Sequence, residues 1–200
     1  MYVKHFEADR KLYAIISEQL DPIPLTNNIM HKLINSIMSQ QLSTKVADIL
    51  QKRFLLLINK KNILPKHVLA FTQAQIKAIG LSSQKANYIT NVAQFFLTQK
   101  LSNKKLHTLT NQQLITLLTQ IKGIGQWTVE MLLMFGMGRE NVFTTGDYGI
   151  KVAMVKIYKL QHLTGKALLN KMEDISKKWH PYQTYACRHL WMYKDGTANI

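Results

Sequence analysis

The chain has 200 residues, of which 46% are hydrophobic, so it can bury a core and is not a disordered tail. Lysine and arginine number 26 against 11 aspartates and glutamates, which gives a formal charge of +15 and favours a polyanionic partner such as DNA or RNA, although an anionic membrane or another acidic partner would also fit. The single cysteine, Cys187, excludes an intramolecular disulfide and cannot by itself hold an iron–sulfur cluster or a structural zinc.

Apolar residues recur at intervals of three or four along nearly the whole chain, which predicts helices. The pattern is clearest at Leu33, Ile34, Ile37, Met38 and Leu42. The same spacing predicts further helices over residues 6–19, 44–57, 84–97, 113–121, 127–135, 148–158, 166–177 and about 182–193. Alternating β patterns are scarce, so we expect an all-α protein.

Signals for helix ends accompany this pattern. Thr72 and Thr110 are each followed three residues later by glutamine, as in a capping box that satisfies free amides at a helix start. Gly80 and Gly123 each follow an apolar helical run, where glycine can adopt the left-handed conformation that ends a helix. These signals predict two similar units of a helix followed by a turn.

The most informative segment is IKGIGQWT at residues 121–128, between two helical stretches. Its glycines allow the backbone to approach a ligand closely. If the next helix begins just after Gly125, its first amides and the positive end of its dipole meet an approaching anion. A DNA phosphate is the obvious candidate, and a plain tight turn between two helices is the alternative.

Asp147 follows this segment by about 20 residues, and the combination resembles the helix-hairpin-helix superfamily of DNA glycosylases. Residues 142–151, VFTTGDYGIK, resemble the active-site segment of its 3-methyladenine DNA glycosylase II branch, the AlkA type. Residues 37–47 (IMSQQLSTKVA) and 80–89 (GLSSQKANYI) resemble two further signatures of that branch. The resemblance runs from about residue 9 to residue 196.

This resemblance implies two helical lobes with a helix-hairpin-helix motif and the active site in the cleft between them. It divides a single glycosylase unit, residues 1–200, into lobe 1 of about residues 28–145 and lobe 2 of about 1–27 plus 146–200. The amino-terminal β domain of some members has no counterpart, so we expect a short form with only the helical lobes.

By resemblance, Asp147 is the catalytic carboxylate. Hydrolysis of an N-glycosidic bond passes through a sugar with oxocarbenium character, which one fixed negative charge can stabilise while it also places water. A position just before a helix keeps the carboxylate ionised and aimed, because the helix dipole and free amides face it. The alternative is an ordinary N-cap aspartate.

A flipped base needs flat walls, and an alkylated purine carries a positive charge that electron-rich rings attract. The resemblance assigns the base pocket to Trp127, Tyr148, Trp191 and Met131, with core packing as the alternative for each ring. Met131 stands where some relatives have a tyrosine. Relatives that cleave the strand carry a lysine at the position of Trp127, so we expect water as the nucleophile and no intrinsic strand cleavage.

The resemblance also assigns residues to DNA contact. The hairpin contributes Lys122, Gly123, Gly125 and Thr128, and a turn contributes Gln40, Gln41 and Leu42. One DNA phosphate would be held by Gly123, Gly125 and Thr128. Lys122 would face a phosphate of the DNA backbone. Gln41 or Leu42 would fill the gap left by the flipped base, as a wedge. The alternative is that the two glutamines are ordinary polar surface residues at the end of a helix.

We therefore expect a monofunctional DNA glycosylase that excises alkylated purines of the 3-methyladenine type from duplex DNA in base excision repair. Another lesion preference within the superfamily and a noncatalytic helix-hairpin-helix DNA-binding module are the alternatives. We expect a monomer without membrane association, cytoplasmic at a bacterial nucleoid or nuclear in a eukaryote. No cofactor and no metal cluster is expected, since the histidines lack paired spacing, and family resemblance alone implies a monovalent cation at the hairpin carbonyls.

Overall fold

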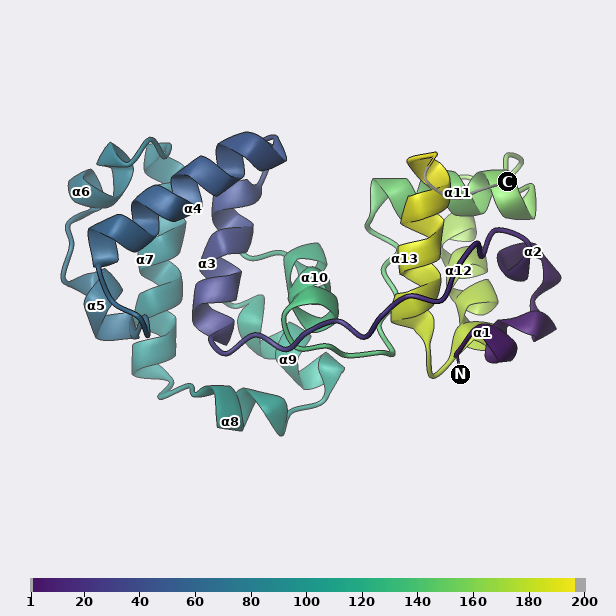
Figure 1. Cartoon of the computed structure of the whole chain (residues 1–200), viewed down its shortest axis with the longest axis horizontal. Helices are drawn as coiled ribbons and strands as arrows, with labels where there is room; N and C mark the ends of the chain where they lie inside the picture. The colour runs from purple at the N-terminus through teal and green to yellow at the C-terminus, as the bar shows by residue number, and fades with distance from the viewer. Residues whose placement is uncertain (1, 197–200) are drawn as a thin grey trace. The chain divides into compact units, whose positions relative to one another are not determined.

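The computed structural model describes residues 2–196, and every regular element within them is a helix, as the sequence predicts. The helices form two compact units (Figure 1). One unit is Pro24–Met137. The other combines the described residues of Met1–Ile23 and Gly138–Ile200. Within the described residues, no helix is long and apolar enough to cross a membrane.

The unit of residues 24–137 contains eight helices: α3 (Ile29–Ser39), α4 (Thr44–Ile58), α5 (Pro65–Leu69), α6 (Gln73–Ala78), α7 (Ser83–Thr98), α8 (Asn103–His107), α9 (Asn111–Leu118) and α10 (Gln126–Phe135). Helix α7 packs against α3, α5 and α6, and α3 also packs against α4 and α10. Five apolar residues of α3 are fully buried: Ile29, Leu33, Ile34, Ile37 and Met38. Helix α3 is therefore the centre of this unit's core.

Leu42 does not continue α3, although its spacing predicts that it does. The helix ends at Ser39, and Gln41 adopts a left-handed φ of 59°, which turns the chain away from the helix axis. Leu42 is consequently 39% exposed instead of buried with its predicted partners. The three residues Gln40, Gln41 and Leu42 form a surface turn between α3 and α4.

The end signals are confirmed. Thr72 and Thr110 form complete capping boxes at the starts of α6 and α9. Gly80 and Gly123 follow these two helices with φ of 112° and 106°, in the region that favours glycine. The two predicted units of a helix followed by a turn are therefore both present.

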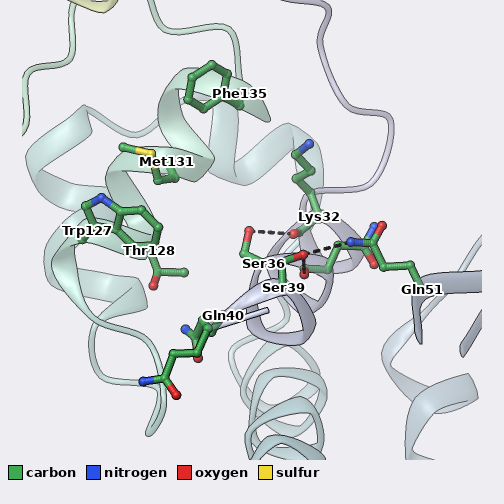
Figure 2. Close-up of a pocket in the computed structure, with 11 residues that line it drawn as sticks. Lys32, Ser36, Ser39, Gln40, Gln51, Trp127, Thr128, Met131 and Phe135 are labelled. Atoms are coloured by element: carbon green, nitrogen blue, oxygen red, sulfur yellow. Dashed lines mark hydrogen bonds between the residues drawn. The ribbon is translucent and has the colours of Figure 1, made fainter. Parts of the chain in front are cut away.

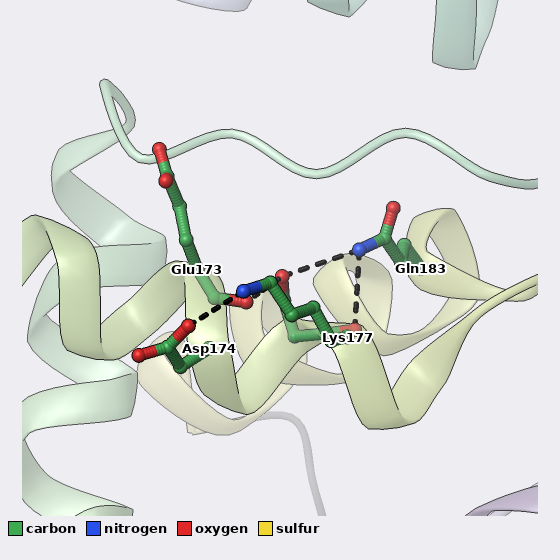
Figure 3. Close-up of polar contacts among 5 residues, drawn as sticks. Glu173, Asp174, Lys177 and Gln183 are labelled. Carbon is green, nitrogen blue, oxygen red and sulfur yellow. Dashed lines mark hydrogen bonds and ion pairs between the residues drawn. The ribbon is translucent and has the colours of Figure 1, made fainter.

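The second unit contains α1 (Tyr2–His5), α2 (Arg10–Tyr13), α11 (Tyr148–Tyr158), α12 (Gly165–Ser176) and α13 (Gln183–Lys194), with short 3₁₀ turns at Phe6–Ala8 and Lys177–Trp179. Its central contact is between α11 and α13. The predicted helix over 166–177 ends at Ser176, where Gln183 Nε2 donates to the Ser176 carbonyl at 3.1 Å (Figure 3). Lys177 continues into the turn and pairs with Asp174 at 2.7 Å.

A single helix over residues 6–19 is wrong. Asp9 interrupts it, because its Oδ1 accepts from the Leu12 amide at 3.3 Å and starts α2 as an N-cap. Its Oδ2 accepts from the Tyr158 hydroxyl at 2.7 Å and the Trp179 indole at 3.0 Å. A buried carboxylate with three donors fixes this break, and sequence spacing alone does not reveal those distant partners.

Candidate active site

The hairpin follows α9 and ends where α10 begins at Gln126, directly after Gly125, as predicted. Gly123 is required for two reasons. Its φ is 106°, and a Cβ there would lie 2.2 Å from Cγ of Tyr88. A Cβ on Gly125 would meet nothing within 4 Å, so the backbone is open on that side. A helix start of this kind can receive an anion such as a phosphate.

The other predicted hairpin residues differ in accessibility. Lys122 is exposed, and its carbonyl accepts from Asn91 Nδ2 at 3.3 Å. Thr128 is only 4% exposed, and its side chain lines a cavity. Its predicted contact with a phosphate stays a prediction, whereas Lys122 is free to extend from the surface.

That cavity has a volume of about 560 Å³ and lies entirely within the unit of residues 24–137. Figure 2 shows its α10 side and its α3 side. Helix α10 contributes Trp127, Thr128, Met131 and Phe135, α3 contributes Lys32, Asn35, Ser36 and Ser39, and Gln40, Gln41 and Gln51 complete the lining. Apolar groups on one wall, and amide, hydroxyl and lysine ammonium groups on the other, suit a planar heterocycle.

The structure therefore brings together Trp127 and Met131, predicted for the base pocket, with Gln40 and Gln41, predicted for DNA contact. Trp127 is 43% exposed, which counts against pure core packing for this ring. The polar groups of α3 were missed by sequence reasoning. Their signal was present, because Lys32, Ser36 and Ser39 recur at intervals of three or four on a helix whose other side is apolar.

Asp147 is the N-cap of α11, as its position predicts. Its Oδ1 accepts from the Ile150 amide at 2.9 Å and from the Trp191 indole Nε1 at 2.9 Å. An ordinary N-cap explains the first bond but not the second. Two N–H donors fix the orientation of a carboxylate that is only partly buried and so can still meet a ligand.

Gly149 allows the bond between Asp147 and Trp191. A Cβ at this position would lie 3.0 Å from Trp191 Cδ1 and 3.2 Å from Asp147 Oδ1, so a larger residue would displace the indole or the carboxylate. Tyr148 is 75% exposed, which excludes core packing for its ring. Sequence reasoning missed the role of Trp191 as a donor to Asp147, since 44 residues separate the two positions in the chain.

The predicted site residues thus form two groups, each within one unit. Asp147, Tyr148 and Trp191 belong to one unit, and the hairpin with the cavity belongs to the other. Among the described residues, no group of three or more histidine, cysteine, aspartate or glutamate side chains could hold a metal ion.

The turn of residues 119–125 joins α9 to α10, which is the arrangement of a helix-hairpin-helix motif. The chain belongs to the HhH-GPD superfamily of base excision DNA repair proteins, whose family pattern matches residues 34–179.

Named relatives agree with this family. DNA-3-methyladenine glycosylase 1 of Schizosaccharomyces pombe is 32% identical over 162 residues, which cover 80% of this chain and 70% of that protein. YfjP of Bacillus subtilis is 28% identical over 194 residues, which cover 94% of this chain and 66% of YfjP.

Solved structures agree as well. A DNA-3-methyladenine glycosidase from Bacillus halodurans superposes with a TM-score of 0.85 at 32% identity, covering 98% of this chain and 90% of that one. The S. pombe 3-methyladenine DNA glycosylase Mag1, in complex with abasic DNA, gives a TM-score of 0.80 at 24% identity, covering 100% of this chain and 98% of that one. The second likeness concerns the fold.

Proposed function

We propose that this protein is a monofunctional DNA glycosylase, which removes alkylated purines of the 3-methyladenine type from duplex DNA in base excision repair. One observation carries the proposal: the Asp147 carboxylate is held by two N–H donors at 2.9 Å at the start of a helix, with an exposed tyrosine beside it. The names of the relatives, DNA-3-methyladenine glycosylases, support the same reaction and substrate class.

The reaction needs one carboxylate and one water. As the bond between C1′ and the base nitrogen breaks, its electrons pass to the alkylated purine, which leaves without its positive charge. The sugar becomes positively charged, and Asp147 stabilises it. Water then bonds to C1′ and releases a proton to the carboxylate or to solvent, which leaves an abasic site in the DNA.

Selection of the damaged base rests on its charge. Trp127 and Met131 line a cavity of about 560 Å³, large enough for a planar base, and Tyr148 presents an exposed ring in the other unit. Electron-rich rings attract a cationic alkylated purine more than a neutral one. The α3 wall, with the ammonium group of Lys32, the amide of Asn35 and the hydroxyls of Ser36 and Ser39, offers hydrogen bonds to the edge of the base.

The absence of a lysine at position 127 makes water the nucleophile, so the strand is not cut. The enzyme acts as a monomer on duplex DNA, at the nucleoid or in the nucleus, without an organic cofactor. A monovalent cation at the hairpin carbonyls belongs to this proposal as well. Borohydride trapping on alkylated DNA tests the nucleophile: no adduct is expected, and a trapped adduct would overturn the monofunctional assignment.

The decisive variant is Asp147→Asn. Asparagine is an equally good N-cap, so α11 should keep its start while the negative charge is lost. We expect single-turnover release of 3-methyladenine to fall at least about a hundredfold, with unchanged affinity for undamaged duplex. The matched control is Asp48→Asn, which changes an exposed aspartate on α4 and should release the base at the normal rate.

The result also separates the alternatives. Unchanged release by Asp147→Asn would remove the catalytic assignment, and no release by the unmodified protein would favour a noncatalytic DNA-binding module. Duplexes carrying 3-methyladenine, 7-methylguanine, ethenoadenine, hypoxanthine or uracil, compared by single-turnover rates, rank the lesions. Fastest release of an uncharged lesion would contradict the preference for alkylated purines.

A further inference from the structure

Helix α7 supplies none of the residues assigned to the catalytic group or the base pocket, yet its side chains contact two loops assigned to DNA. These loops are the turn of Gln40, Gln41 and Leu42, here called the wedge turn, and the hairpin of residues 122–125. All three elements belong to the unit of residues 24–137. Residues 80–89, which include the start of α7, resemble a family signature, and no role has yet been assigned to them.

Lys85 holds the wedge turn. Its ammonium group donates to the Met38 carbonyl at 3.0 Å and to the Gln40 carbonyl at 2.6 Å. These carbonyls lie at the end of α3, where acceptors lack intrahelical partners and the helix dipole favours a cation. The surrounding protein lowers the pKa of Lys85 by desolvation, which agrees with an ammonium group turned inward instead of toward solvent.

The carbonyls bound by Lys85 lie next to a residue with a strained backbone conformation. Gln41 follows Gln40, whose carbonyl accepts from Lys85, and has a φ of 59°, which non-glycine residues rarely adopt. Such a conformation persists only where neighbouring groups enforce it. Gln41 is exposed, and the predicted wedge is Gln41 or Leu42, so the two bonds from Lys85 help to fix where the wedge side chains project.

Tyr88 supports the hairpin. Its ring occupies the space that a Cβ on Gly123 would need, at 2.2 Å from Cγ. The hydroxyl of Tyr88 accepts from Gln84 Nε2 at 2.7 Å, which fixes the ring, and Asn91 Nδ2 donates to the Lys122 carbonyl at 3.3 Å. The Lys122 carbonyl and the Cα of Gly123 therefore both face side chains of α7.

The positions 85, 88 and 91 follow each other at intervals of three, so neighbouring members are adjacent on the helix surface. A helix of 16 residues is rigid, and three residues advance about 4.5 Å along its axis. One rigid element therefore sets the spacing between the wedge turn and the hairpin. We infer that Lys85 and Tyr88 are positioning residues, Lys85 for insertion of the wedge during base flipping and Tyr88 for phosphate binding by the hairpin; this inference rests on the proposed function.

The test of Lys85 is the variant Lys85→Met, which keeps most of the apolar stem and removes the donors. With a 2-aminopurine base beside an alkylated base, we expect a smaller fluorescence rise on binding, and single-turnover release reduced about tenfold. Affinity for undamaged duplex should match that of Lys104→Met, a control that removes an exposed lysine on α8. Lys85→Arg keeps the donors and should restore most of the flipping signal.

The melting temperature identifies a general loss of structure. In a variant that keeps the melting temperature of the parent, a parallel loss of flipping and affinity would overturn the role in wedge insertion. A normal flipping signal and normal release in Lys85→Met would overturn it too. If the methionine variant does not fold, Lys85→Gln, which keeps a neutral NH2 donor group, replaces it and should show an intermediate flipping signal.

The test of Tyr88 uses the opposite readout. Tyr88→Ala should weaken binding to undamaged duplex about tenfold, because misplaced hairpin amides lose hydrogen bonds to a phosphate, while release at saturating enzyme stays normal. Tyr88→Phe keeps the ring beneath Gly123 and should bind nearly normally. Unchanged affinity of the alanine variant would overturn the role of Tyr88. Affinity and flipping need no base release, so an inactive parent protein would contradict the proposed function and leave these two readouts to decide the inference.

Discussion

At the residue scale, Trp191 combines a flat ring with a hydrogen-bond donor. Its Nε1 donates to Asp147 Oδ1 at 2.9 Å, and Gly149 leaves room for the indole beside the carboxylate. The sequence resemblance assigns this ring to the wall of the base pocket. The structure adds that the indole orients Asp147, so a loss of Trp191 has two separable consequences.

Trp191→Phe isolates the donor, because phenylalanine keeps an aromatic ring without the N–H group. A hydrogen bond to a charged group contributes about 1.5–3 kcal/mol, so we expect single-turnover release of 3-methyladenine to fall by roughly tenfold to a hundredfold. Affinity for duplex with an abasic site analogue should change little. Release at the normal rate would mean that the indole N–H does not orient the carboxylate for catalysis.

At the element scale, the capping box at Thr110 starts α9, the helix that leads into the hairpin. The Thr110 hydroxyl accepts from the Gln113 amide at 3.2 Å, and Gln113 Oε1 accepts from the Thr110 amide at 2.8 Å. Thr110→Ala removes the first of these bonds. We expect the free energy of unfolding to fall by about 1 kcal/mol.

Urea denaturation measures that loss. The matched control is Thr116→Ala, which removes the same atoms from an exposed position within α9. Alanine is the better helix former there, so the control should be neutral or slightly stabilising. Equal destabilisation by both variants would mean that the box contributes nothing beyond packing of the threonine side chain.

Local rules explain which elements the sequence predicts well. The predicted helix over 148–158 agrees with α11 at both ends, because Asp147 is a strong N-cap and the apolar period is regular. The predicted helix over 6–19 is wrong, because Asp9 bonds to partners far away in the chain and interrupts the helix. The prediction that Leu42 continues α3 is wrong for a related reason. Gln41 takes a left-handed conformation, which Lys85 helps to enforce from another helix.

The candidate site likewise has features that the sequence predicts and features that it does not. Sequence motifs identify Asp147 and the hairpin glycines, because their chemistry depends on adjacent backbone. The bond from Trp191 to Asp147 and the ring of Tyr88 beneath Gly123 depend on contacts between residues far apart in the chain. A single sequence carries no direct signal for such contacts, and they appear only once the helices are packed.

At the scale of the whole molecule, the formal charge of +15 means that lysines and arginines, 26 in all, far outnumber the 11 acidic residues. Among the described residues, only two close pairs are formed, Lys177 with Asp174 and Lys194 with Asp195. Most cations therefore remain available to phosphates. Binding to DNA should weaken steeply with salt, because each neutralised phosphate releases counterions.

The slope of log affinity against log salt concentration counts these contacts. Lys122 is exposed beside the hairpin, so Lys122→Gln should reduce the magnitude of the slope by about 0.9 and weaken binding equally on damaged and undamaged duplex. Lys177→Gln is the matched control, since Asp174 already compensates this charge at 2.7 Å, and it should leave the slope unchanged. A slope unchanged by Lys122→Gln would show that Lys122 does not contact phosphate, and DNA binding by the hairpin would then rest on its backbone amides and Thr128.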